Sequence, residues 1–317
     1  MSLLEVRDLV VTYRSPGRPP VTAVAGAGLT VERGRIAGLV GESGCGKSTL
    51  GKAVVGLLAP SAGTVTFDGE PVVPLTRRAR PAAQRRLQMI FQDPFSSLNP
   101  RRTVGDQIDD GLRLAGLGGD RNRVTELLGR VSLPADAAGR YPHEFSGGQR
   151  QRVAIARALA AEPRCVVADE PISALDASAQ ASVALLLVEL ARELDMGLLF
   201  VSHDLAIVRQ IADTVTVMYL GTVVESGPTA EVWARPRHPY TRALIDAVPR
   251  PDGAGRLPAT LPGDVPDPSS PPSGCRFRLR CPLAEPECAR RVPELVEVAP
   301  GHTAACPVVR APLSATR

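Results

Sequence analysis

The sequence predicts an α/β protein built on a mainly parallel sheet, because strand-like and helix-like segments alternate along most of the chain. The runs IAGLV, CVVAD and GLLFVS are continuously apolar, as strands are when helices cover both faces of a parallel sheet. A glycine-rich turn follows IAGLV and opens a helical pattern. These observations favour strand–turn–helix units arranged around one sheet.

The remaining elements follow from local pattern. LLEVRDLVVTY and AGLTVERGRIAGLVG predict strands on either side of a hairpin loop at residues 14–20, and TVTFDG predicts another strand. A helix is expected to begin near Lys47. Residues 103–133 have helical periodicity, and SVALLLVELARELDM is a helix. Residues 249–272 hold eight prolines, which indicates a linker or an irregular lobe.

Composition limits the function. The chain has 317 residues and a net charge of +4 from 37 basic and 33 acidic residues, an excess too small to argue for nucleic acid. Glu5, Arg7 and Asp8 interrupt the N-terminal apolar run, so we expect no signal peptide. No stretch approaches the roughly 20 apolar residues of a membrane span. We therefore expect a soluble, cytoplasmic protein whose membrane role, if any, requires partner subunits.

The strongest local motif is GESGCGKS, Gly41 to Ser48, which fits the phosphate-loop pattern. Its glycines allow the backbone to approach phosphate oxygens, and the following helix N-terminus directs N–H groups at the negative charge. Lys47 is expected to contact the β and γ phosphates and Ser48 to hold Mg²⁺. The expected phosphate-loop contacts are Gly41, Ser43, Gly44, Cys45, Gly46, Lys47, Ser48 and Thr49.

A second motif, CVVADEP, is an apolar strand that ends in two carboxylates. Asp169 is suited to hold Mg²⁺ through water, and Glu170 to orient or deprotonate an attacking water. A solvated acidic turn would show the same residues, but its neighbour, the phosphate loop, favours the catalytic interpretation.

The stretch FSGGQRQRVAIARAL resembles the signature motif of ABC ATPases, with Phe145 where leucine is more common. Its matching residues are Ser146, Gly147, Gly148 and Gln149. The resemblance implies that this turn clasps the γ-phosphate of ATP held by the phosphate loop of a second subunit.

Other motifs match the same family in order. Tyr13 lies where the family stacks a ring on adenine, although an exposed strand tyrosine would look alike. Gln92 matches the glutamine that senses the γ-phosphate and Mg²⁺ and links to the membrane subunit. SALD, Ser173 to Asp176, resembles the D-loop, and His203 matches the switch histidine. The resemblance implies an ATPase with Glu170, His203 and Lys47 as catalytic residues.

The resemblance covers about residues 1–250 and implies the architecture. We expect a RecA-like P-loop NTPase core with an antiparallel β segment and an α-helical subdomain at about residues 95–160. A nucleotide-binding domain would span residues 1–248. A small irregular lobe with a cysteine cluster would form residues 249–317.

Three runs, QDPFSSLNPR, HEFSGGQRQR and HPYTRALIDAVP, resemble ATPase subunits of oligopeptide/dipeptide importers, and GESGCGKSTLGKAVVGLL the second of their two ATPases. This implies a heterodimer with a related ATPase, two transmembrane permeases, an extracytoplasmic solute-binding protein and a place at the cytoplasmic face of the membrane. Import of nickel or another solute is the alternative. A soluble non-transport ABC ATPase fits less well, because the chain has one cassette and no long heptad repeats.

Four of the six cysteines lie near the C-terminus, at Cys275, Cys281, Cys288 and Cys306. Their gaps of five, six and 17 residues differ from structural zinc sites, where at least one pair is usually two to four residues apart. Four thiolates can also ligate an iron–sulfur cluster. The segment resembles the extension of peptide-importer ATPases in which such cysteines bind a [4Fe–4S] cluster. Zinc, disulfides and free thiols remain open.

Overall fold

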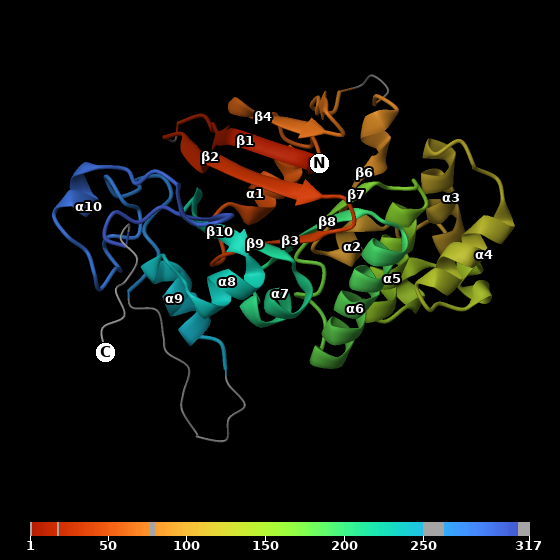
Figure 1. Ribbon diagram of the computed structural model, residues 1–317. Coiled ribbons are helices and arrows are strands. Elements are labelled where there is room, and N and C mark those ends of the chain that lie inside the picture. Colours follow the sequence, from red (N-terminus) through yellow and green to blue (C-terminus); the bar gives the residue numbers. More distant parts are fainter. Residues whose placement is uncertain (1, 18, 77–79, 250–262, 310–317) are drawn as a thin grey trace.

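The computed structural model describes residues 2–17, 19–76, 80–249 and 263–309 (Figure 1). Its main sheet has eight strands in the order β11-β12-β10-β9-β3-β8-β7-β6. The parallel part comprises β3 (Ile36–Val40), β6 (Leu87–Ile90), β7 (Cys165–Asp169), β8 (Gly197–Ser202) and β9 (Thr214–Tyr219). The predicted mainly parallel sheet is therefore confirmed.

A second, antiparallel sheet is formed by the N-terminal part of the chain. Its order is β2-β1-β4-β5, with β1 (Ser2–Tyr13), β2 (Val21–Glu32), β4 (Ala62–Phe67) and β5 (Glu70–Pro71). β1 and β2 pair antiparallel on either side of the predicted hairpin loop. Helix α1 (Lys47–Val54) contacts strands of both sheets, and in Figure 1 it lies below β1 and β2.

Most of the helices begin where a polar side chain caps them. The hydroxyl of Thr103 accepts from the N–H of Asp106 at α3, and the Asp120 carboxylate caps α4 in the same way. The α-helices after α1 are α2 (Pro94–Ser97), α3 (Val104–Leu114), α4 (Arg121–Arg130), α5 (Gly147–Leu159), α6 (Ala177–Glu193), α7 (Leu205–Ile211), α8 (Thr229–Ala234), α9 (Pro239–Asp246) and α10 (Glu287–Arg290). Three 3₁₀ turns lie at Ala83–Arg86, Ala135–Gly139 and Pro142–Glu144.

The strands of the main sheet supply alternate residues to two apolar cores. Ile36 and Val40 of β3 belong to the core under the helices, whereas Ala37 and Leu39 belong to the core shared with α1 and the antiparallel sheet. Because successive strand residues point to opposite faces, a strand covered on both faces has to be apolar throughout. This accounts for the apolar runs in the sequence.

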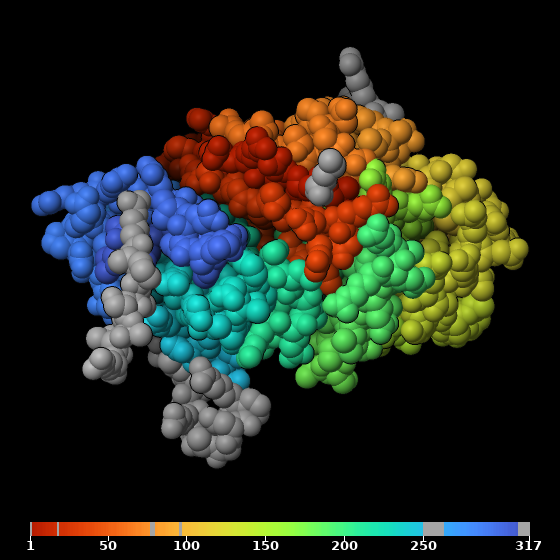
Figure 2. Space-filling view, viewed as in Figure 1, coloured from red at the N-terminus to blue at the C-terminus, as the bar shows by residue number. Residues whose placement is uncertain are grey.

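The C-terminal segment adds regular structure that the sequence did not indicate. Strands β11 (Val296–Ala299) and β12 (His302–Ala304) extend the main sheet, with β12 antiparallel to β10 (Thr222–Pro228). We call residues 263–309 the C-terminal lobe; Figure 2 shows it in blue, packed against the N-terminal strands. Most of the predicted linker, residues 250–262, lies outside the described ranges, so the division at residue 248 stays a prediction.

A buried contact between a histidine and a glutamate joins β12 to β10. His302 Nε2 lies 2.7 Å from Glu225 Oε1, and the two side chains are 1% and 0% exposed. The same carboxylate accepts from the backbone N–H groups of Arg237 and His238, at 2.7 and 2.8 Å. Glu225 on β10 therefore has three partners without contact with water.

No helix within the described ranges has both the length and the apolar character required to cross a bilayer.

Replacing His302 with alanine should destabilise the protein, because the Glu225 carboxylate would lose its imidazole partner while staying buried. We expect the free energy of unfolding to fall by about 3 kcal/mol, measured by urea denaturation. Thr303→Ala is the control; its hydroxyl donates only a 3.3 Å hydrogen bond to the Ser226 carbonyl, so the loss should be under about 1 kcal/mol. Equal losses for the two variants would contradict the proposed anchor.

Candidate nucleotide-binding site

The phosphate loop turns tightly between β3 and α1. Gly41 has φ 152° and Gly46 has φ 103°, and a Cβ at either position would lie 2.2 Å from a backbone oxygen, of Met218 or Ala23 respectively. Only glycine fits both places. No side chain caps α1, so the first N–H groups of this helix face the loop. The concave loop and its free N–H groups suit a phosphate.

The Lys47 ammonium lies inside this loop. Its Nζ donates to the carbonyls of Gly41 and Glu42, at 2.8 and 3.1 Å, and lies 3.8 Å from Glu170 Oε1. The side chain is 3% exposed. The lysine is therefore held at the point where phosphates would enter, by acceptors that they could replace.

Ser48 and Asp169 meet next to the loop. Ser48 Oγ donates to Asp169 Oδ1 at 2.8 Å, although the two residues belong to α1 and to the end of β7. Burial raises the pKa of Asp169, and the hydrogen bond from Ser48 opposes that rise. Hydroxyl and carboxylate oxygens are ligands that Mg²⁺ prefers, so these two residues fit the predicted magnesium site.

Glu170 is the centre of a second group of side chains. Gln92 Nε2 donates to Glu170 Oε2 at 2.9 Å, and His203 Nδ1 lies 3.3 Å from the same oxygen. Glu170 has φ 45°, which is unusual for a residue other than glycine, and its N–H donates to the Val201 carbonyl at 2.9 Å. The left-handed backbone thus directs this carboxylate toward Lys47, Gln92 and His203. Gln92, also predicted to bind Mg²⁺, contacts Glu170 here.

Tyr13 lies at the edge of the loop. Its Oη is 3.2 Å from Thr49 Oγ1, and its side chain is 44% exposed. The ring is thus open to a stacking partner on the side of the phosphate loop, as the adenine prediction requires.

The signature residues form a separate group. The Ser146 hydroxyl accepts from the N–H of Gln149 and caps α5, while the Gln149 side chain accepts from the N–H of Ser146. A Cβ on Gly148 would lie 3.3 Å from Ala179 Cβ on α6, close to the Ser173–Asp176 turn. Within the described ranges, no hydrogen bond or ion pair joins Ser146–Gln149 to the phosphate loop of the same chain.

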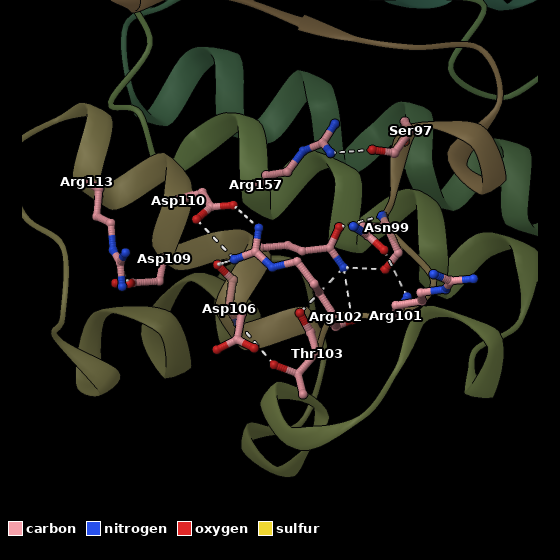
Figure 3. Close-up of polar contacts among 11 residues, drawn as sticks. Ser97, Asn99, Arg101, Arg102, Thr103, Asp106, Asp109, Asp110, Arg113 and Arg157 are labelled. Atoms are coloured by element: carbon pink, nitrogen blue, oxygen red, sulfur yellow. Dashed lines mark hydrogen bonds and ion pairs between the residues drawn. The ribbon is translucent and has the colours of Figure 1, made fainter.

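A polar network joins the segment after Gln92 to the helical subdomain (Figure 3). Arg157 of α5 donates to the carbonyl of Ser97, and burial lowers the pKa of Arg157. The Gln107 side chain of α3 accepts from the N–H of Asn99 at 2.8 Å and donates to its carbonyl at 3.1 Å. The helix that carries the signature is therefore tied to the glutamine segment, a link that motif matching did not reveal.

The four C-terminal cysteines lie in one lobe. Burial raises the pKa of Cys275 to about 11 and also raises that of Cys281 and Cys306, with further contributions from neighbouring cysteines. Within the described ranges, however, no three His, Cys, Asp or Glu side chains are arranged to hold a metal ion. The thiols as they stand do not fit a cluster, and the predicted [4Fe–4S] cofactor gains no support from the structure.

The two remaining cysteines, Cys45 and Cys165, are both buried. Burial raises the pKa of Cys165 to about 12. Sequence reasoning missed two partners of the phosphate loop, Tyr240 and Arg280, which both contact Glu42. Tyr240 lies in the run HPYTRALIDAVP and Arg280 directly precedes Cys281, and neither stretch has a pattern that would place it at the loop.

Comparison with known proteins identifies the family of the chain. Residues 24–173 match the family described as ABC transporter, and residues 224–288 match the oligopeptide/dipeptide transporter C-terminal region. A Brucella ovis protein named for peptide import and ATP binding is 49% identical over 308 residues, 96% of this chain and 97% of that protein. The oligopeptide transport ATP-binding protein AppF of Bacillus subtilis is 46% identical over 293 residues, 90% of this chain and 89% of AppF.

Solved structures show the same fold. The dimeric ATP-binding cassette MJ0796, in a post-hydrolysis state bound to ADP and Pi, has a TM-score of 0.64 and 28% identity, over 71% of this chain and 98% of that one. CbiO1 from Clostridium perfringens, part of the ABC transporter complex cbiONQ, has a TM-score of 0.63 and 30% identity, over 74% and 91%. The chain therefore belongs to the ABC transporter family, as an ATP-binding and ATP-hydrolysing subunit, and carries the C-terminal region of the oligopeptide/dipeptide branch.

Proposed function

We propose that this chain powers the import of peptides through a multisubunit ABC transporter. ATP hydrolysis is supported by one observation: Lys47, Gln92 and His203 converge on Glu170, beside the Ser48–Asp169 pair. The peptide half is supported by the match of residues 224–288 and by the names of relatives that are 46–49% identical over nearly the whole chain.

Each residue at the site has a distinct role in this proposal. The loop N–H groups and Lys47 bind the phosphates, while Tyr13 stacks on the adenine. Ser48 and Asp169 hold Mg²⁺, assisted by Gln92, and the ion would neutralise charge on the phosphates. Glu170 accepts a proton from the attacking water, and His203 holds the γ-phosphate in line for attack.

The signature residues act on a second nucleotide. Within the described part of the chain, no hydrogen bond joins Ser146 or Gly148 to the phosphate loop, whereas a helix N-terminus with two glycines suits a γ-phosphate. We propose that they complete the site of a related ATPase subunit in a heterodimer. Loss of the bridging γ-phosphate would reopen the dimer.

Dimer closure would reach the membrane through the helical subdomain. Arg157 and Gln107 connect α5 and α3 to the segment that follows Gln92, so a movement of the signature helix is transmitted to that segment. We propose that this surface contacts two permease subunits at the cytoplasmic face of the membrane. An extracytoplasmic binding protein would deliver the peptide.

The C-terminal lobe carries a further proposal, a [4Fe–4S] cluster on Cys275, Cys281, Cys288 and Cys306. Its support is the donor type and the gathering of four thiols in one lobe. Their present arrangement speaks against it. No catalytic step depends on this cluster.

Glu170→Gln should lower ATP turnover by about 100-fold or more, because the amide cannot accept the proton of the attacking water. ATP affinity should stay near the wild-type value, since Lys47 and the loop are unchanged. Steady-state hydrolysis by the assembled transporter and binding of a fluorescent ATP analogue measure the two effects. Glu189→Gln, an exposed change on α6, is the matched control and should be active. Normal turnover in Glu170→Gln would reject the assigned base.

The transported solute can be tested with the complete transporter in proteoliposomes. Binding proteins loaded with short peptides should stimulate ATP hydrolysis, whereas nickel or sugars should leave the basal rate unchanged. Stimulation by nickel alone would instead support the alternative solute and refute peptide import.

Anaerobic purification followed by iron and sulfide analysis tests the cluster. A bound [4Fe–4S] centre should give about four iron atoms and four acid-labile sulfides per chain. Cys281→Ser should remove most of the iron, while Cys165→Ala, in the buried core, should retain it. Absence of iron and sulfide from the wild-type chain would dismiss the proposal.

A further inference from the structure

An ion pair joins the C-terminal lobe to the phosphate loop. Arg280 Nη1 and Nη2 donate to the two Glu42 carboxylate oxygens at 2.7 and 3.0 Å, so the guanidinium and the carboxylate form a bidentate ion pair. Glu42 is the second residue of the GESGCGKS loop, whereas Arg280 is 238 positions further along the chain. The lobe therefore contacts the phosphate loop directly.

Among the ion pairs formed by arginines, this one differs in its burial. The Arg280 side chain is 4% exposed and Glu42 is 23% exposed. Within the described ranges, the other arginines that form ion pairs are 29% to 70% exposed. Exposed pairs contribute little, whereas breaking a buried pair is strongly destabilising, so a buried arginine holds its partner in one place.

An aromatic cluster fixes the position of Arg280. Tyr219, Tyr240 and Phe277 have ring centroids 4.7 to 5.3 Å apart and are at most 1% exposed. The Arg280 guanidinium lies 5.8 Å from the centroid of the Tyr219 ring. Tyr240 Oη also accepts from the backbone N–H of Glu42 at 2.9 Å. Arg280 therefore holds the side chain of Glu42, and Tyr240 holds its backbone.

The opposite side of Glu42 faces the catalytic lysine. Its carbonyl accepts from Lys47 Nζ at 3.1 Å, so a shift of Glu42 would move an acceptor of that lysine. A second route runs through Arg276, which donates to the Leu220 carbonyl; the N–H of the adjacent Gly221 donates to the Cys45 carbonyl at 2.8 Å. Of two arginines in one short segment, Arg280 thus contacts the loop directly and Arg276 acts on it through Leu220 and Gly221.

We propose that Arg280 is a positioning residue for the phosphate loop, so that the C-terminal lobe sets the affinity of the site for ATP. This inference rests on the proposed function only in taking Gly41–Ser48 as the ATP-binding loop. Arg280 acts through Glu42, which fixes the carbonyl and N–H groups at the entrance of the loop. The lobe is then a part of the nucleotide site.

The test is ATP binding by the full chain carrying Arg280→Ala. We expect the dissociation constant for a fluorescent ATP analogue with Mg²⁺ to rise about tenfold, within the range of coupling between sites. In the assembled transporter KM for ATP should rise in proportion, with kcat changed far less. Arg278→Ala is the matched control, because Arg278 donates to Ser273 inside the lobe, and it should bind ATP like the wild type.

A double-mutant cycle separates positioning from a general loss of stability. Glu42→Gln alone should also weaken ATP binding, and adding Arg280→Ala to it should cause little further loss. Arg280→Lys keeps the charge but cannot form the bidentate pair, so its dissociation constant for ATP should lie between those of the wild type and Arg280→Ala. It also provides a test if the alanine variant does not fold. A wild-type dissociation constant in folded Arg280→Ala or Arg280→Lys, or full additivity with Glu42→Gln, would overturn the inference. Failure of the wild-type chain to bind ATP would instead refute the proposed function.

Discussion

The geometry of the site depends on one backbone constraint, the tight turn between β3 and α1. The carbonyls of Met218 and Ala23 leave no room for a Cβ at Gly41 or Gly46, so only glycine can occupy these two positions. The turn directs the N–H groups of α1 and the Lys47 ammonium into one hollow. Because β3, β7 and β8 run parallel, their carboxyl ends bring this hollow, Asp169–Glu170 and His203 to the same edge of the sheet.

Most of this edge could be predicted from the sequence, because each part is a local motif that follows an apolar strand. The positions of Lys47, Asp169 and His203 follow from the strand that precedes each of them and from the parallel order of the sheet. Long-range contacts were different: no local pattern pairs Arg280 with Glu42 or Arg157 with Ser97. Arginines are abundant in this chain, and which of them becomes buried depends on packing that only the folded chain defines.

The signature turn is preformed at the start of α5. Ser146 caps α5, and its hydroxyl already satisfies the Gln149 N–H, so the turn is stable without a nucleotide. A rigid, preformed helix N-terminus can accept a phosphate brought to it by another subunit without reorganising. The network around Gln107 and Arg157 then holds that helix against the segment of Gln92, which contacts Glu170. In the proposed mechanism, these contacts would connect dimer closure at the signature helix to Glu170.

Two of the contacts that attach the C-terminal lobe to the core have different consequences. The Glu225–His302 pair is sealed from water and joins β12 to the main sheet, so it holds the lobe in place. Arg280 extends from that anchored lobe to Glu42, a residue of the loop itself. Because the lobe is anchored and the aromatic cluster around Arg280 is closely packed, the Arg280–Glu42 contact can hold the loop in position. Because Arg280 lies between Phe277 and Cys281, the position proposed for it depends on the packing of both neighbours, and a repacking of this part of the lobe would alter the contact with Glu42.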